Sequence, residues 1–133
     1  MHQLTKGRNS SLYVSTTLTN GTKLYELYNQ FSVSEETNNY RLFLGGSATG
    51  TLGDSMRSHD LSGMSFSTPD RDNDGFPRNC DADSAIRGGW WFNWCHQAFL
   101  NGQWSPGSWY RPWYPTVSDN KQTKETFMML KHN

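Results

Sequence analysis

Residues 70–80 read DRDNDGFPRNC, and this stretch constrains the fold more than any other part of the sequence. Carboxylates occur at alternate positions, Asp70, Asp72 and Asp74, and a glycine that can turn the backbone follows them. Hard divalent cations prefer several oxygen ligands, and carboxylates at every second residue of a curved segment can aim their oxygens at one point. The stretch therefore predicts a calcium loop, with Asp72 and Asp74 as the first candidate ligands.

Two other interpretations fit the same letters. A solvated turn also contains Asp, Asn and Gly. The string also fits the EF-hand pattern D-x-D-x-D-G, with Asp81 at the twelfth position, where that pattern expects Glu. An EF-hand needs a helix on each side, but SFSTP precedes the string and Cys80 and then a double glycine follow it. Neither flank is typical of an amphipathic helix, so we expect a calcium loop on an irregular scaffold.

The two cysteines, Cys80 and Cys95, frame a 14-residue interval rich in Gly and Trp. A zinc site would want more Cys or His ligands at metal spacing, and His96 alone does not complete one. A disulfide is the simpler interpretation, and closing so short a loop stabilises a domain by about 3 kcal/mol in the chain-entropy model. Two Asn-x-Ser/Thr acceptors, at Asn9 and Asn20, also favour an oxidising, extracellular setting.

Composition limits the classes of protein and partner. At 133 residues the protein is expected to form one domain, and only 34% of the residues are apolar, so its core must rest on a few large rings. All six tryptophans fall within residues 90–113, which predicts a loop-rich aromatic cluster. Twelve basic and twelve acidic residues with no basic run disfavour a nucleic-acid partner. No apolar stretch is long enough to span a bilayer, and no signal peptide begins at Met1, so a targeting segment of an exported protein would lie outside this sequence.

The first part of the sequence is typical of an antiparallel meander. Residues 11–18 and 23–28 favour strands, and Asn20-Gly21 between them is a hairpin turn signal. Further strands are expected at 30–33 and 40–44, the latter ended by a Gly-Gly pair, and a short helix at 51–56. Residues 61–115 have no sustained period and predict loops. The apolar run 126–130 is either a strand that closes the sheet or a helical turn.

Several uncommon pieces follow one another in a fixed order, and together they identify a family resemblance. They are YRL at 40–42 with LGG at 44–46, GD at 53–54, FST at 66–68 before the aspartates, NC at 79–80, GWWF at 89–92 with CH at 95–96, and LNG at 100–102. This pattern resembles the fibrinogen C-terminal globular domain, which occurs in fibrinogen chains, ficolins, tachylectins, tenascins and angiopoietins. The resemblance covers nearly the whole sequence, although the family domain is longer and has an N-terminal subdomain, with its own cysteine pair, that is missing here.

The resemblance implies an α+β fold with one calcium site. A twisted antiparallel sheet with short helices would comprise residues 1–62 and 123–133, and a loop-rich calcium-binding and ligand-binding subdomain with one disulfide would comprise 63–122. In the family, the second and third aspartates of the string and two backbone carbonyls hold the ion. Those positions match Asp72, Asp74 and the carbonyls of Phe76 and Arg78. Asp70 would then act through the direct ligands or be solvated.

The resemblance also implies a ligand pocket beside the second cysteine. Many relatives bind acetyl groups there, next to a cis peptide bond, which here joins Trp94 to Cys95, and the N–H groups of Cys95 and His96 would hold the acetyl oxygen. His96 is equally well interpreted as a structural histidine. Acetyl-binding relatives often carry Tyr where this sequence has Ser84, and the loop after Gly102 departs from theirs. Trp109 or Tyr110 could then replace the lost walls of the pocket.

Catalysis is not expected, because no Ser, His or Asp lies in a nucleophile motif and the four histidines are scattered. The leading hypothesis is a secreted, Ca²⁺-binding recognition domain that binds acetylated or anionic glycans, as innate-immune lectins of this family do. The alternative is a receptor-binding or adhesive module of the angiopoietin-like or matrix type, in which the same surface docks a protein. Relatives usually oligomerise through segments outside this domain, so the full-length protein is expected to form an oligomer.

Overall fold

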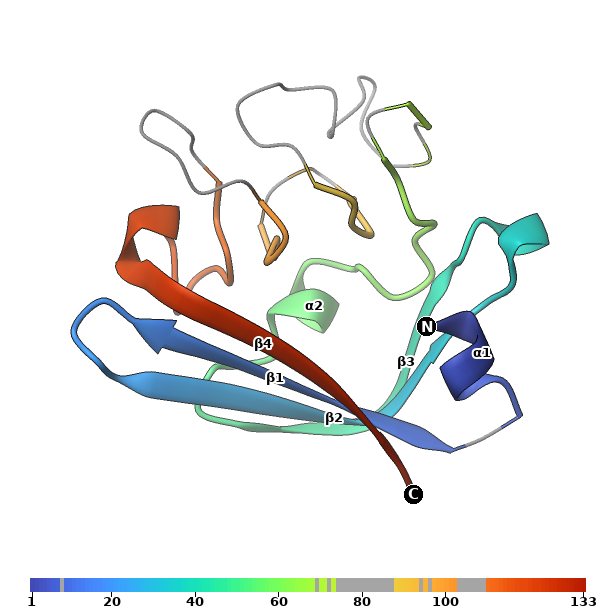
Figure 1. The fold of residues 1–133 in the computed structure, drawn as a ribbon, viewed down its shortest axis with the longest axis horizontal. Helices are drawn as coiled ribbons and strands as arrows, with labels where there is room; N and C mark the ends of the chain where they lie inside the picture. Colours follow the sequence, from blue (N-terminus) through green and yellow to red (C-terminus); the bar gives the residue numbers. More distant parts are fainter. Residues whose placement is uncertain are drawn as a thin grey trace.

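The computed structural model describes residues 1–7, 9–68, 70–71, 73, 88–93, 95, 97–102 and 110–133. The elements in sequence order are α1 (His2–Thr5), β1 (Ser10–Leu18), β2 (Lys23–Val33), the 3₁₀ turn η1 (Glu36–Asn38), β3 (Leu42–Gly50), α2 (Ser55–Ser58), the 3₁₀ turn η3 (Asn120–Gln122) and β4 (Thr123–His132). Figure 1 shows the sheet on one side and α2, with the described segments that follow it, on the other. No helix in these described ranges is long and apolar enough to cross a bilayer.

The four strands form one antiparallel sheet in the order β3-β2-β1-β4. The predicted hairpin joins β1 to β2 at Asn20-Gly21, where Gly21 has a φ of +90° that suits glycine. The last strand, β4, returns to pair with β1 from Ser10 opposite His132 to Leu18 opposite Thr123. The apolar run near the C-terminus is therefore a strand that closes the sheet, which the sequence alone left open.

The structure corrects three predicted boundaries. β2 is one strand from Lys23 to Val33, and β3 continues through the Gly-Gly pair to Gly50. The pairing steps from Tyr28 opposite Ala48 to Gln30 opposite Gly45, so β3 holds one extra residue there. This bulge uses the glycine: Gly46 has a φ of +63°, so the pair bends the strand without ending it. The predicted helix begins later, as α2, where the Asp54 side chain accepts the N–H of Arg57 at 3.1 Å.

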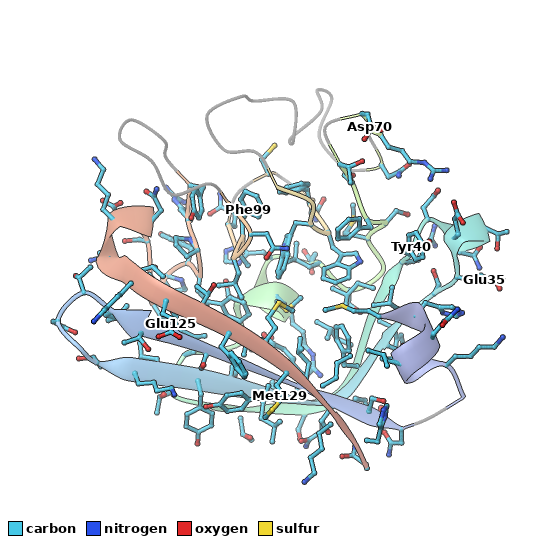
Figure 2. The ribbon with its side chains drawn as sticks, in the orientation of Figure 1. Glu35, Tyr40, Asp70, Phe99, Glu125 and Met129 are labelled. Carbon is cyan, nitrogen blue, oxygen red and sulfur yellow. The ribbon has the colours of Figure 1, made fainter. Side chains whose placement is uncertain are left out.

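The two faces of the sheet differ. The inner face is buried under the loops and consists of Leu12 and Val14 from β1, Tyr28, Phe31 and Val33 from β2, and Leu42 and Leu44 from β3. The outer face exposes large apolar side chains, among them Phe43 at 57%, Phe127 at 51% and Met129 at 49%. Figure 2 shows Met129 projecting away from the loops and Phe99 among them. Strand alternation thus gives one buried and one exposed apolar face.

Aromatic rings fill the space between the sheet and the loops, as the composition predicted. Phe92 and Phe99 pack edge to face with their centroids 4.9 Å apart, and Trp113 lies 6.4 Å from Tyr28 of β2. The Trp113 indole N–H donates to the Gly53 carbonyl at 2.6 Å, which satisfies its polar end. These large rings hold irregular loops in place where no regular element does.

Candidate functional site

Most of the predicted site residues lie outside the described residues. They are the calcium ligands Asp72, Asp74, Phe76 and Arg78, the pocket residues Ser84, His96 and Trp109, and the cysteine Cys80. Trp94 is also outside, so the predicted cis bond, the disulfide and the calcium site remain predictions. In the ranges that the structure does describe, no three His, Cys, Asp or Glu side chains lie close enough to hold a metal ion.

The entrance to the predicted calcium loop is a tight turn. Thr68 and Arg71 exchange backbone hydrogen bonds of 3.1 and 3.0 Å. The exposed Asp70 carboxylate accepts the Thr68 hydroxyl at 2.7 Å, and this hydrogen bond lowers the pKa of Asp70. The Asp70 carboxylate therefore hydrogen-bonds within its own turn at the surface, as expected of a solvated carboxylate.

The same entrance is tied to the aromatic core. Ser67 and Trp90 form an isolated antiparallel bridge with hydrogen bonds of 2.9 and 3.1 Å. The buried Ser67 hydroxyl accepts the backbone N–H of Asn73 at 2.9 Å, and the Asn73 side chain donates to the Phe66 carbonyl at 3.0 Å. Residue 73 lies in the sequence between the two predicted carboxylate ligands, and these two contacts hold residue 73 itself against residues 66 and 67.

A cavity of about 230 Å³ lies beside Cys95. We call it the Cys95 cavity, and its lining is Ser58, His59, Asp60, Leu61, Asn93, Cys95 and Gln97. Asp60 and Cys95 have φ values of 56° and 65°, in the left-handed region that residues other than glycine rarely adopt. Such residues concentrate at ligand sites, where the surrounding structure enforces them.

Hydrogen bonds connect the walls of the Cys95 cavity to its surroundings. The Asn93 side-chain amide lies 3.5 Å from the carbonyl oxygens of His59 and Asp60. The side-chain oxygen of Gln97 accepts a hydrogen bond from the Arg111 guanidinium at 2.8 Å. The His59 ring packs against Tyr114 with centroids 5.9 Å apart. The cavity is small and lined by amides, a carboxylate and an imidazole, which suits a compact polar group such as an acetamide.

Sequence reasoning placed only Cys95 at this cavity. It treated His59 as one of several scattered histidines and did not single out Asp60, Asn93 or Gln97. These residues come from the turn that follows α2 and from the segment around Cys95, and no sequence spacing connects them. A backbone signal could not have found them either, because their meeting depends on the packing of the loops against the sheet.

Tyr110, the other described pocket residue, lies elsewhere. It is 5% exposed, its hydroxyl donates to the Gly102 carbonyl at 3.0 Å, and its ring packs edge to face on Phe99 at 5.3 Å. Burial raises the pKa of Tyr110. Tyr110 lines a different cavity, shared with Leu100 and Gly102. The described residues therefore do not bring Tyr110 and Cys95 into one pocket.

Both predicted glycosylation acceptors lie at the surface. Asn20 is exposed at the β1–β2 turn, where its side-chain oxygen accepts the Thr22 N–H at 2.9 Å. Asn9 is exposed just before β1. The positions are accessible to a glycosyltransferase, and their modification remains a prediction.

A third cavity, of about 390 Å³, was not anticipated from the sequence. We call it the Trp90 cavity; its lining is Met1, His2, Val33, Asn39, Tyr40, Phe66, Thr68, Arg71, Asn73, Trp90, Trp91, Asn101 and Met128. The Trp91 indole N–H donates to the Tyr40 carbonyl at 2.8 Å. The neighbouring Trp90 indole N–H is buried and has no hydrogen-bond partner in the part of the protein that the structure describes.

Comparison with known proteins gives consistent matches. A family model described as the C-terminal globular domain of fibrinogen beta and gamma chains matches residues 1–131. Fibroleukin of Bos taurus is 43% identical over 109 residues, which are 77% of this chain and 24% of fibroleukin. Ryncolin-4 of Cerberus rynchops is 35% identical over 107 residues, which are 80% of this chain and 30% of ryncolin-4. The chain thus spans about a quarter to a third of the length of these curated relatives.

Solved structures agree with this match. The fibrinogen-like globe domain of human ANGPTL2 is 30% identical, with a TM-score of 0.81 over 98% of this chain and 61% of that one. A lamprey fibrin D-dimer complexed with the peptide ligand Gly-His-Arg-Pro-amide is 28% identical, with a TM-score of 0.79 over 97% of this chain and 47% of that one.

Proposed function

Because this protein belongs to the family of C-terminal globular domains found in fibrinogen beta and gamma chains, we propose that it is an extracellular recognition domain stabilised by calcium. Its ligands are N-acetylated or anionic glycans, bound beside Cys95. The proposed role is recognition without catalysis.

The Cys95 cavity is the observation that carries this proposal. Its two left-handed residues, Asp60 and Cys95, turn backbone groups into positions that regular structure does not offer. An acetamide presents a carbonyl acceptor, an N–H donor and a methyl group. Asn93 and Gln97 supply amide groups to the walls, and the buried Leu61 supplies an apolar surface for the methyl. The predicted donors at Cys95 and His96 complete this set.

Calcium has a structural role in this proposal. Asp72 and Asp74 supply two carboxylates that balance the charge of the ion, the carbonyls of Phe76 and Arg78 add two further oxygens, and water completes the shell. Hard oxygen donors of this kind suit Ca²⁺ and not a thiophilic metal. The neighbouring Asn73 hydrogen-bonds Ser67, which pairs with Trp90, so calcium bound next to Asn73 would support the aromatic core.

The decisive experiment compares binding of N-acetylglucosamine with that of glucosamine, which lacks the acetyl group. Isothermal titration calorimetry in calcium should show binding only of the acetylated sugar. Binding should be lost in Asn93→Ala and His96→Ala and kept in the control His132→Ala, because His132 lies at the end of β4, on the sheet. Equal binding of both sugars, or unchanged affinity in Asn93→Ala, would contradict acetyl recognition in the Cys95 cavity.

A second candidate is recognition of a protein or peptide. The lamprey fibrin D-dimer, which shares this fold at a TM-score of 0.79, was solved with a short peptide ligand. A peptide also presents amide carbonyl and N–H groups of the acetamide type. This candidate would be favoured over a glycan by two results together. The protein binds no glycan on an array, and it still binds to a cell surface unless the cells have been treated with protease.

A further inference from the structure

The outer face of the sheet carries a groove with a polar floor. Its volume is about 230 Å³, and its lining is Ser15, Thr17, Lys23, Glu125 and Phe127. We call it the Ser15 groove. The strand β1 supplies the small side chains of Ser15 and Thr17, and β2 and β4 lie on either side of β1. Thr17 pairs with Lys23 of β2 and with Glu125 of β4. Ser15 pairs with Phe127 of β4. Short side chains therefore form the floor, and longer ones on the neighbouring strands form the walls.

The floor of the Ser15 groove offers hydroxyl groups that nothing in the described protein satisfies. Ser15 is only 3% exposed, and its hydroxyl makes no hydrogen bond within the described residues. The Thr17 hydroxyl has no partner there either. Buried polar groups normally do have one. The backbone of β1 is already paired on both sides, so a ligand in the groove is recognised by side chains.

The walls of the groove carry one charge of each sign. Lys23 stands on the β2 side and Glu125 on the β4 side, so two strand spacings, about 10 Å, separate their backbones. Neither charged group takes part in an ion pair or a hydrogen bond within the described ranges. The Phe127 ring, 51% exposed, forms the apolar part of the β4 wall. The groove thus combines donors, acceptors and one aromatic face with no net charge.

These groups limit the kind of ligand that fits. Opposite charges on the two walls favour neither an anion nor a cation, and the polar floor disfavours a lipid chain. A peptide strand would need backbone partners, which β1 has already used. A sugar ring in which every hydroxyl is equatorial has hydroxyls around its rim and only C–H groups on its faces. Such a ring matches hydroxyl and charged partners together with an aromatic face.

We infer that the Ser15 groove is a saccharide site, separate from the Cys95 cavity, for a neutral chain of β-linked pyranose rings. One ring stacks on Phe127 and directs its hydroxyls to the floor and the charged walls. The groove suits a single ring, because pockets for drug-sized ligands are larger, about 300–1,000 Å³. The next ring of the chain lies on Tyr13 and Tyr25, whose rings stack with centroids 5.8 Å apart. Tyr25 pairs with Ser15 and is 41% exposed, so this platform adjoins the groove.

The test is an NMR titration of this protein with methyl β-cellobioside, which has two such rings and no acetyl group. The backbone amide signals of Ser15 and Thr17 should shift and saturate. Methyl β-D-glucopyranoside, which has one ring, should bind about tenfold more weakly, because it lacks the second stacking contact. In a saturation-transfer experiment, the axial C–H protons on one face of the sugar should receive the most saturation, since that face lies on Phe127.

Matched variants identify the residues responsible. Phe127→Ala should weaken cellobioside binding about tenfold, because it removes the stacking face. The control is Phe43→Ala, which removes an equally large ring that is 57% exposed on the same face but lies outside the groove, and its affinity should not change. Ser15→Ala should weaken binding about fivefold through the lost hydrogen bond. Far-ultraviolet circular dichroism establishes that each variant is folded.

Four results would overturn the inference. Shifts at Asn93 and Cys95 in place of Ser15 and Thr17 would put the sugar in the Cys95 cavity. Unchanged spectra up to the solubility limit of the sugar would show that no site exists. Equal weakening by Phe127→Ala and Phe43→Ala would indicate unspecific adsorption. Shifts of the Ser15 amide with protein concentration and without sugar would show that a second copy covers this face. Acetyl recognition beside Cys95 is measured with a different sugar, so either idea can fail without the other.

Discussion

Trp90 and Trp91 offer a matched test of what an indole N–H contributes to stability in this core. The two rings are adjacent, almost fully buried and 5.2 Å apart. Only Trp91 has a partner for its N–H, the Tyr40 carbonyl at 2.8 Å, whereas Trp90 Nε1 has none within the described residues. Replacing each by Phe removes the same atoms and the same N–H group. The difference between the variants therefore isolates the hydrogen bond.

The expected magnitudes follow from this difference. Either substitution loses apolar burial worth about 1 kcal/mol. Trp91→Phe also loses a hydrogen bond and strands the Tyr40 carbonyl, a further cost of about 1 kcal/mol or more, so it should destabilise by about 2 kcal/mol. Trp90→Phe removes a buried donor that carries a desolvation penalty of about 1–3 kcal/mol, which offsets the lost burial. Its free energy of unfolding should therefore stay near that of the parent protein.

Urea unfolding followed by far-ultraviolet circular dichroism measures both variants without relying on tryptophan emission. Trp91→Phe should unfold at lower urea than Trp90→Phe, with a free-energy gap of about 2 kcal/mol and unchanged slopes. If Trp90→Phe costs as much as Trp91→Phe, the reasoning about the unpaired indole is refuted.

Three further predictions concern the metal, the pH and the packing. Excess chelator should lower the melting temperature of the parent protein and of Asp70→Asn. It should not lower that of Asp72→Asn, which should already melt at a lower temperature because it lacks a calcium ligand. Equal chelator sensitivity in all three proteins would exclude Asp72 as a calcium ligand. Burial raises the pKa of Glu26 above its ordinary 4.5, so this carboxyl favours folding below that pH and loses the benefit as the pH rises through its folded value. Glu26→Gln should therefore raise the melting temperature at pH 7 and not at pH 4, and a gain at both would contradict the titration. Gly102→Ala would bring a methyl group within 2.6 Å of the Tyr110 ring and should destabilise by about 1–3 kcal/mol in urea unfolding, with an unchanged midpoint as the contrary result.

Local signals in the sequence predicted the elements that depend on local chemistry. Strand-favouring residues over 11–18 and 23–28 and the Asn20-Gly21 turn predict the first hairpin, because a two-residue turn between strands fixes their pairing. The run at 126–130 remained ambiguous until its partner was known, since only pairing with β1 selects a strand. The Gly45-Gly46 pair predicts the end of a strand because glycine weakens strands, but in the structure β3 continues through the pair as a bulge that uses the conformational freedom of glycine.

The candidate site was less predictable for a physical reason. Family resemblance named Cys95, but His59, Asp60 and Asn93 approach it only after α2 and the loops pack on the sheet. No sequence pattern predicts the Trp90 cavity either, because adjacent tryptophans predict only core packing. Which of the two indole N–H groups finds a hydrogen-bond partner depends on the path of the backbone near Tyr40. Such contacts are determined by tertiary structure and have no fixed spacing in the sequence.

The strand β4 has a further consequence, for handling this protein in solution. In the described sheet it forms one edge, and edge strands present unpaired backbone groups to other molecules. Its exposed Phe127 and Met129 add an apolar surface, while the exposed Lys124 and Lys131 flank them with positive charge. Repulsion between these lysines in two copies opposes edge-to-edge association, and salt screens that repulsion. Association of two copies through this edge should accordingly be stronger at high salt than at low salt.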